Sequence, residues 1–514
     1  MKHIRVFIVA IALLLVTRTA HATIWYVHPD STLNCIQDCL DSCANGDTVS
    51  VGPGVYYENI VWPNVQGIHL VSELGPDTTI IDGGSTGRVI QISTGTDSAT
   101  LISGFTVRNG YLTGIYDHGA GILCENSSPT ITNNIITGNR VGGAAFGGGI
   151  VCLGNSSPTI TGNVVSENGG GAHDGVRGGG IACCDSSAPF IAENTVSGNY
   201  ATVAGGGIYC FGNAMPTITG NVIADNATGE CMCGWIGGGI ACDYRSAPVI
   251  TANTITGNYA NFGGGIGCDS SEPFIDDNNI TGNTGYCGGG IHCQGSSSTI
   301  SNNTVSNDTA VWDGGGIYCY QASPTFTGNI VSENVIPLTG FGGGMVCDGS
   351  SPVVSGCIIL GNYGNGIYCQ PDVWGNHSSP EIHHNDICDN VGYGICNIDT
   401  TVMVSADSNW WGDETGPYHP AVNPAGLGDS VSDYVDFVPW LTAPIGIEEL
   451  PIVGPVDRVS IGATIFRGSL QLPEGKKCKV FDITGRSVEP RNIAPGIYFL
   501  EVDNKIVQKV VKVR

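Results

Sequence analysis

The feature that most constrains this chain is a repeat. The tetrapeptide Gly-Gly-Gly-Ile, or a close variant of it, occurs eleven times, and its last residues are spaced by 22 to 32 residues. Those last residues are Ile122, Ile150, Ile181, Ile208, Ile240, Ile266, Ile291, Ile317, Met345, Ile367 and Ile395. Between the copies, Thr, Val and Ile alternate with small polar residues, which is the period of a strand. One such unit cannot bury its apolar face alone, so the units must stack as coils of a right-handed parallel β-helix.

A cysteine follows the repeat isoleucine by two residues in ten of the eleven copies. These are Cys124, Cys152, Cys183, Cys210, Cys242, Cys268, Cys293, Cys319, Cys347 and Cys369. Residues two apart in a strand share a face, so we expect these thiols to stack inside the rod as small apolar residues. Disulfides between coils are the alternative and would be strained, and a metal site lacks the usual paired Cys-x-x-Cys spacing.

Asparagines recur in the motif Asn-x-[Ile/Val]-x-x-Asn, as at 163–168, 194–199, 253–258 and 329–334. An asparagine amide can bond to the amide of the next coil, and asparagine tolerates left-handed backbone at a corner. We therefore expect ladders of asparagine with a structural role.

The repeat region, residues 23–441, resembles the parallel β-helix proteins of the pectin-lyase-like superfamily, and its Gly-Gly-Gly-Ile and Asn motifs also resemble those of polymorphic outer-membrane-protein adhesins. The resemblance implies an N-terminal cap, about 23–60, with a short amphipathic helix at 36–40. It also implies a closing coil, about 405–441, around Asn409-Trp410-Trp411-Gly412. Caps of this kind cover the strand edges at the two ends of the rod.

Charge is distributed unevenly along the chain. Residues 23–441 hold five arginines, no lysine and 37 acidic residues, whereas residues 458–514 hold eleven basic and five acidic residues. Such an acidic body repels phosphate backbones and anionic lipid, which argues against nucleic-acid partners. Cations and sugars are the better candidates for a ligand.

Asp243 and Asp269 each follow a ladder cysteine in consecutive coils, so both should project from one outer face about 5 Å apart. A calcium site there, extended by Asp185 or Asp276-Asp277, is one hypothesis; solvated acidic surface is the other. The sequence singles out no catalytic residue and no other cofactor site.

Enzymatic activity does not follow from the resemblance, because this fold carries lyases, hydrolases, adhesins and spacers alike. The arginine or lysine base of the pectate lyases would need a basic groove, and five arginines scattered over whole coils do not supply one. The polygalacturonase motifs are incomplete. We therefore expect a non-enzymatic, adhesin-like protein that binds carbohydrate or another cell-surface ligand; the alternative is a polysaccharide hydrolase or lyase.

The two ends of the chain predict export. Residues 1–22 have a basic start, an apolar run and the small-x-small sequence Ala20-His21-Ala22, which predicts a signal peptide cleaved after Ala22. That run is too short for a transmembrane anchor, and no later segment is long enough.

After a linker at 442–457, residues 458–514 alternate polar and apolar residues, which predicts a small antiparallel β-sandwich. The segments Phe-Asp-Ile-Thr-Gly-Arg, Pro-Gly-Ile-Tyr and the terminal Lys-Val-Val-Lys-Val-Arg resemble the C-terminal sorting domain of the type IX secretion system. That resemblance implies the secretion machinery as a partner, and a secreted or outer-membrane-surface location.

Overall fold

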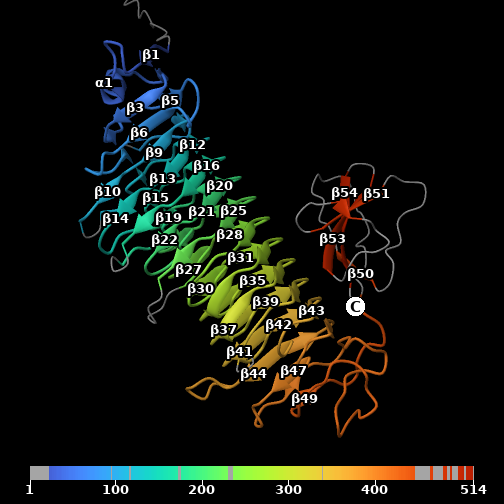
Figure 1. Cartoon of the computed structure of the whole chain (residues 1–514). Coiled ribbons are helices and arrows are strands. Elements are labelled where there is room, and N and C mark those ends of the chain that lie inside the picture. The colour runs from blue at the N-terminus through green and yellow to red at the C-terminus, as the bar shows by residue number, and fades with distance from the viewer. Residues whose placement is uncertain are drawn as a thin grey trace, which may run out of the picture.

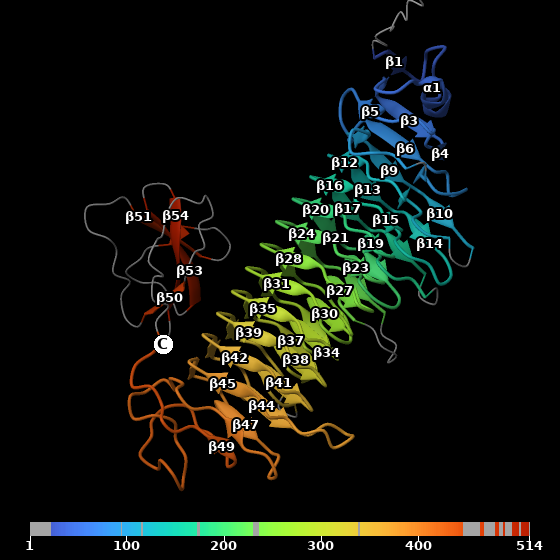
Figure 2. The same ribbon diagram turned by 180° about the vertical axis from the view of Figure 1, so that it is seen from behind.

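The computed structural model describes residues 22–445, except 94, 115–116, 172–174, 230–235 and 338–339, together with five strands of the C-terminal segment. Residues 23–441 form a rod of parallel strands, and in Figures 1 and 2 successive coils follow one another from the N-terminal cap to β49. The predicted parallel β-helix is confirmed.

Three long sheets run along the rod, and a discontinuous fourth lies beside them.

Sheet A contains 16 strands: β1 Ile24–Val27, β2 Thr48–Val51, β5 His69–Ser72, β8 Leu101–Ser103, β12 Thr130–Thr132, β16 Thr159–Thr161, β20 Phe190–Ala192, β24 Thr217–Thr219, β28 Val249–Thr251, β31 Phe274–Asp276, β35 Thr299–Ser301, β39 Thr325–Thr327, β42 Val353–Ser355, β45 Glu381–His383, β48 Val404–Ser405 and β49 Val435–Asp436.

Sheet B contains 13 strands: β3 Gly54–Tyr57, β6 Thr79–Asp82, β9 Thr106–Arg108, β13 Ile135–Thr137, β17 Val164–Ser166, β21 Thr195–Ser197, β25 Val222–Ala224, β29 Thr254–Thr256, β32 Asn279–Thr281, β36 Thr304–Ser306, β40 Ile330–Ser332, β43 Ile358–Leu360 and β46 Asp386–Cys388.

Sheet C also contains 13 strands: β4 Ile60–Val61, β7 Ile90–Ile92, β11 Ile122–Glu125, β15 Ile150–Leu153, β19 Ile181–Cys183, β23 Ile208–Cys210, β27 Ile240–Asp243, β30 Ile266–Asp269, β34 Ile291–Gln294, β38 Ile317–Tyr320, β41 Met345–Asp348, β44 Ile367–Gln370 and β47 Ile395–Asn397.

Sheet D is made of short strands that precede the glycine repeats: β10 Tyr111–Leu112, β14 Arg140–Val141, β18 Gly169–Gly170, β22 Tyr200–Ala201, β26 Ala227–Thr228, and the separate pair β33 Thr284–Cys287 and β37 Thr309–Asp313.

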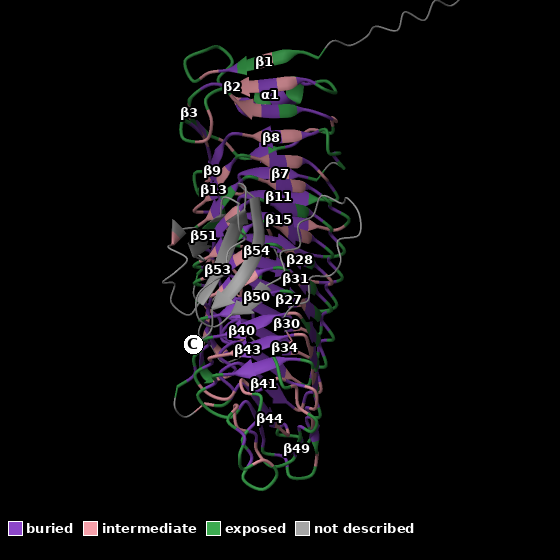
Figure 3. Cartoon of the chain, turned by 90° about the vertical axis from the view of Figure 1, so that its right-hand side faces the viewer, coloured by how far each residue is buried: buried purple, intermediate pink, exposed green. Residues whose placement is uncertain are grey.

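The interior of the rod repeats in register from coil to coil. In sheet C each repeat isoleucine pairs with the next isoleucine and each ladder cysteine with the next cysteine, as Cys242 does with Cys268. All ten ladder cysteines are fully buried free thiols in the described structure, so the core-packing prediction is confirmed. Figure 3 shows buried residues along the strands and exposed ones concentrated in the turns.

Two asparagine ladders line the corners on either side of sheet B. Asn226, for example, accepts hydrogen bonds at Oδ1 from the backbone and side-chain amides of Asn199, at 3.0 and 2.9 Å. It donates from Nδ2 to the carbonyl oxygen of Val196 and to Asn258 Oδ1. The left-handed residue at this corner is Asp225, with φ of 54°, and not the asparagine. The ladders are thus confirmed, but their asparagines act through buried side-chain amides and not through left-handed backbone.

The expected short helix is present at the N-terminal end as α1 (Ile36–Ser42), with Ile36 and Leu40 fully buried against the first coils. At the opposite end Trp411 is fully buried in the same core. No helix among the described residues has the length and apolar character that crossing a bilayer requires.

The described part of the C-terminal segment is one five-stranded sheet in the order β50 (Ala463–Phe466), β54 (Lys505–Lys512), β53 (Gly496–Val502), β51 (Cys478–Asp482), β52 (Ser487–Val488). The pair β50 and β54 is parallel and the other pairs are antiparallel. The second layer of a sandwich stays a prediction. The predicted signal peptide lies outside the described residues except for Ala22.

Candidate functional site on the outer face of sheet C

The outer face of sheet C is the part of the rod that changes most from coil to coil. The residue between each repeat isoleucine and cysteine points outward, and it is successively Leu123, Val151, Ala182, Tyr209, Ala241, Gly267, His292, Tyr318, Val346 and Tyr368. Most of these side chains are nevertheless buried, because the segments before the next glycines fold over them and form two small apolar clusters outside the main core.

The triple glycines make this second layer sterically feasible. A Cβ at Gly206 would stand 2.6 Å from the carbonyl oxygen of Ala227 and 2.7 Å from that of Gly238, and Gly205 has a φ of 62°. Only residues without a Cβ let the backbone of one coil lie this close to the next. The repeat therefore holds the covering segments directly against sheet C.

One group of polar and aromatic side chains on this face centres on Tyr318. Its hydroxyl donates a 2.6 Å hydrogen bond to Oδ2 of Asp348, which ends β41 one coil further along. Asp313 ends β37 in sheet D, and its Oδ1 accepts the backbone N–H of Phe341 at 2.8 Å. Phe341 in turn stacks on Tyr368, with ring centroids 4.6 Å apart. Two carboxyl groups from different sheets thus border an aromatic floor.

Both carboxyl groups in this group hold their protons more tightly than usual. Burial raises the pKa of Asp348, and hydrogen bonding from Tyr318 only partly opposes this. Burial also raises the pKa of Asp313, the N–H of Phe341 opposes it, and the negative charge of Asp348 adds to the increase. The negative charge of Asp372 adds to the increase at Asp348, so both carboxyl groups favour the protonated form more than an exposed aspartate does. We call Asp313, Tyr318, Asp348 and Tyr368 the Asp313–Asp348 site.

Aromatic contacts continue from this site toward the N-terminal end of the rod. His292 lies parallel to Tyr318 with centroids 5.6 Å apart, and Phe262 lies 5.0 Å from His292. Burial lowers the pKa of His292 to about 3, so this imidazole is neutral at ordinary pH. Nearer the N-terminus, Phe211 stacks between Tyr209 and Tyr244. Tyr209 and His292 are buried in this layer, whereas Tyr244 and Phe341 are exposed and supply ring surface beside the carboxyl groups.

Asp243 and Asp269 lie where the sequence placed them, in register at the ends of β27 and β30. Asp243 is half-buried and accepts a 2.8 Å hydrogen bond from the hydroxyl of Tyr209, while Asp269 is bonded to its neighbour Ser270. Burial raises the pKa of Asp243, and the charge of Asp269 adds to this. The two acids are thus part of the same aromatic and acidic face.

The wider acidic cluster of the calcium hypothesis does not form among the described residues. Asp276 ends β31 in sheet A, on another face of the rod, so it cannot join a site with Asp243. No group of three or more metal-binding side chains occurs within the described residues. Calcium binding by Asp243 and Asp269 stays a prediction.

The pair Asp313 and Asp348 was not predicted, because nothing in the repeat relates the end of a sheet D strand to the end of a sheet C strand one coil further along. Lysine and arginine are absent from residues 246–441, so this half of the rod presents carboxyl groups without basic side chains. That imbalance was visible in the sequence and could have drawn attention to these coils.

The family model for the right-handed β-helix region matches residues 88–273 and 264–410 of this chain. No curated protein matches the sequence of this chain. Among solved structures, a periplasmic alginate epimerase is similar at 13% identity and a TM-score of 0.37, covering 81% of this chain and 84% of that one. An alginate lyase from a Paenibacillus species has 13% identity and a TM-score of 0.28, covering 63% of this chain and 99% of that one. Similarities at this level carry no argument about function.

Proposed function

The chain belongs to the right-handed β-helix family, and from this premise we propose that it is a carbohydrate-active enzyme that hydrolyses a neutral polysaccharide at the Asp313–Asp348 site. The observation that carries the proposal is the pair of carboxyl groups with raised pKa values beside Tyr318 on an aromatic surface. Glycoside hydrolysis requires two carboxyl groups flanking the scissile bond, one of them protonated.

The two carboxyl groups take complementary roles in this proposal. Asp348 is the more buried, with 8% of its surface exposed, and is assigned as the acid that protonates the glycosidic oxygen. Asp313, which is less buried, is assigned as the carboxylate that acts on the anomeric side, by activating water or by direct attack. The glycosidic C–O bond breaks and the leaving sugar takes the proton of Asp348; water supplies its hydroxyl to the anomeric carbon, and the remaining proton of that water returns to the pair of carboxyl groups.

The charge of the rod indicates the class of polymer. Uronate polymers are polyanions, and a surface with many carboxylates and, over residues 246–441, no basic side chain repels them. Aromatic rings bind the apolar faces of neutral sugars without a charge requirement. We therefore propose a neutral substrate in preference to a uronate.

A panel of neutral and acidic polysaccharides, assayed for released reducing ends, tests this function. We expect hydrolysis of at least one neutral polymer, with at least about 100-fold loss in Asp348→Asn and in Asp313→Asn, because each removes one proton-transfer group. Asp269→Asn is the matched control at the same edge of sheet C and should stay within about twofold of wild type. Absence of products from every neutral polymer would contradict hydrolysis, and unsaturated products from a uronate would indicate a lyase instead.

Non-enzymatic glycan binding is the second candidate function and was the one that the sequence favoured. The continuation of the aromatic row to Phe211 and Tyr244, far from the Asp313–Asp348 site, favours it. We rank the hydrolase first because binding alone requires no protonated carboxyl beside a second one.

We also propose that the protein is exported and reaches the cell surface through the type IX machinery, on the strength of the sequence motifs at its two ends. Deletion of residues 458–514 should retain the protein in the periplasm, detected by fractionation and surface labelling. The rod should still fold, because α1 and Trp411, which close its two ends, lie outside the deleted segment. Surface display of the truncated chain would contradict the sorting role.

A further inference from the structure

One of the turns that follow the C-terminal ends of the sheet C strands differs from its neighbours in length. The four turns that follow β30, β34, β38 and β41 and lead into sheet A are each four residues long, whereas the turn between β44 and β45 is ten residues, 371–380. The extra residues carry two of the most exposed large apolar side chains of the described chain, Val373 at 86% and Trp374 at 79% exposure. We call residues 371–376 the Trp374 loop.

The Trp374 loop is held in one shape by the carboxylate of Asp372. Its Oδ1 accepts the backbone N–H groups of Trp374 and Asn376, at 2.9 and 2.8 Å. Its Oδ2 accepts the side-chain amides of Asn376 and Gln321, both at 2.6 Å, and Gln321 lies two coils earlier. Burial alone would raise the pKa of Asp372, but these hydrogen bonds outweigh it and lower the pKa to about 2. The carboxylate therefore stays ionised and bonded at any ordinary pH.

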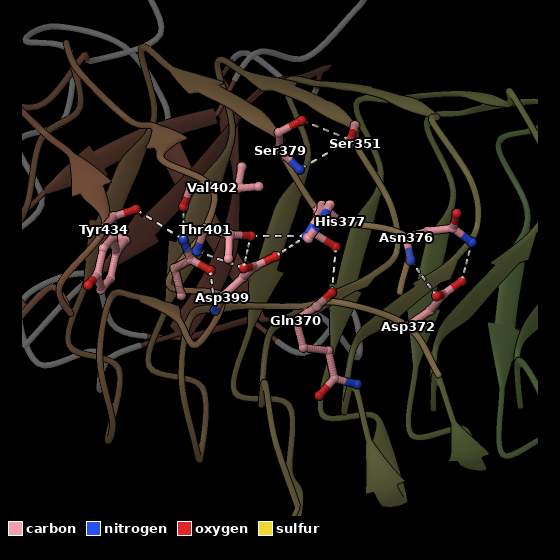
Figure 4. A network of polar contacts seen from close by, with 12 residues as sticks. Ser351, Gln370, Asp372, Asn376, His377, Ser379, Asp399, Thr401, Val402 and Tyr434 are labelled. Carbon is pink, nitrogen blue, oxygen red and sulfur yellow. Dashed lines mark hydrogen bonds and ion pairs between the residues drawn. The ribbon is translucent and has the colours of Figure 1, made fainter. Parts of the chain in front are cut away.

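The chain beyond the loop is anchored just as firmly, as Figure 4 shows. His377 Nδ1 lies 2.5 Å from Oδ2 of the nearly buried Asp399, and the hydroxyl of Thr401 bonds to the other oxygen of that carboxylate. Ser378 donates through its hydroxyl to the carbonyl oxygens of Cys347 in β41 and of Gln370 at the end of β44. The loop is therefore bound to the rod on both sides, and Trp374 projects from a preorganised support.

The loop borders the Asp313–Asp348 site. Asp372 follows the last residue of β44 by two positions, and β44 is the immediate neighbour of β41, which ends at Asp348. The charge of Asp372 contributes to the shifted pKa of Asp348, so the two carboxyl groups lie near one another. A polymer chain bound along the edge of sheet C past Asp348 would next reach the Trp374 loop.

From this arrangement we propose that Trp374 is a sugar-binding residue that stacks on a ring of the neutral polysaccharide beyond the bond being cleaved. The proposal rests on the proposed function for its ligand class. An indole supplies a large flat apolar surface at low cost in side-chain entropy, and a rigid loop removes most of the remaining ordering cost of binding. Exposed apolar side chains fixed in place in this way are typical of recognition sites.

The experiment is affinity electrophoresis of the full chain through gels containing galactomannan, xylan or mixed-linkage β-glucan. We expect at least one polymer to retard the wild type, and Trp374→Ala to weaken that binding about tenfold or more, while Trp374→Phe retains most of it. Asp372→Ala should also weaken binding although Trp374 is present, because the loop loses its support. Phe274→Ala, which removes an exposed ring from the outer face of sheet A, is the matched control and should bind as the wild type does.

Each result bears on this inference separately from the hydrolase proposal. Equal retardation of wild type and Trp374→Ala, or no retardation of wild type in any gel, would overturn the role of Trp374. Hydrolysis that is lost in Asp348→Asn would still support the proposed function in that case. Conversely, retardation that depends on Trp374 without hydrolysis of any polymer would support this inference and contradict the enzyme.

Discussion

The interior of the rod and the outer face of sheet C follow opposite rules. Inside, each coil repeats the same isoleucine, cysteine and asparagine in register with the coil before it. Outside, the residue between the isoleucine and the cysteine changes along the rod, from Leu123 to Ala182 to Tyr318. The repetition stabilises the stack, because each buried asparagine amide finds its hydrogen-bond partners in the neighbouring coils. The variation of residues on the outer face is what allows a local site to form there.

The largest expected effect tests the repeated interior. Asn226→Ala removes the amide that accepts two hydrogen bonds from Asn199 and donates to Val196 and Asn258, so four buried hydrogen bonds are lost. We expect a loss of roughly 4 kcal/mol in unfolding free energy, measured by urea denaturation. Tyr209→Phe, on the outer face, removes one hydroxyl bonded to Asp243 and should lose no more than about 1.5 kcal/mol. Equal losses would erase the distinction between the two regions.

The next prediction concerns Asp308, an acid with asparagines on both sides of it in a ladder. Asp308 takes an asparagine position and accepts both amides of Asn283 at Oδ1, at 2.7 and 3.0 Å, while its Oδ2 has no partner. In the other coils the amide nitrogen at that place donates hydrogen bonds, so a neutral carboxyl that carries its proton on Oδ2 fits the ladder. Burial raises the pKa of Asp308 to about 8.

The sign of the resulting pH dependence follows from this shift. The folded chain keeps the proton at Asp308 that the unfolded chain releases above pH ~4, so stability is greatest below that pH and falls as pH rises toward 8. Asp308→Asn restores a donor and should stabilise the rod by roughly 4 kcal/mol at pH 8 and hardly at all at pH 4, measured by denaturation at both values. A stabilisation that is the same at both pH values would contradict the protonated ladder carboxyl.

The smallest expected effect belongs to the acids on the outer face. Calcium bound by Asp243 and Asp269 should stabilise the rod by no more than about 1 kcal/mol relative to sodium at equal ionic strength, because the described residues around them supply no third carboxylate or histidine. The melting temperature of wild type and Asp243→Asn, each in calcium and in sodium, measures it. A shift that persists in the variant would reflect screening of the acidic surface and no site at these two residues.

The features that could be predicted from the sequence are those that recur in every repeat. The spacing of the isoleucines and cysteines predicts coils in register, and i and i+2 residues of a strand must share a face, so the burial of Cys242 and Cys268 followed directly. The turn at 371–380 also left a trace in the sequence. Ser350-Ser351-Pro352 begins three residues after Cys347, whereas Ser378-Ser379-Pro380 begins nine residues after Cys369.

The repeat does not govern the irregular segments 169–177 and 227–236, which are longer than the matching segments of other coils. His173 and Trp235 in these segments lie outside the described residues. The described part of the first segment contributes Arg177, whose side chain bonds to the carbonyl oxygen of Gly175 in its own loop. The rigid and well-exposed loop is instead the one that carries Trp374.

The amino-acid sequence by itself determined the β-helix, its buried ladders and its acidic surface. These features depend on the alternation of apolar and polar residues within each strand and on a motif that occurs in every coil. Only the tertiary structure decided that Asp313 and Asp348 both lie near Tyr318, and that the Trp374 loop follows the strand next to Asp348. Their proximity arises from the stacking of different coils and from a sheet D strand that folds over sheet C. The distance between two side chains in different coils depends on the lengths of all the strands and turns between them, and no single motif encodes those lengths.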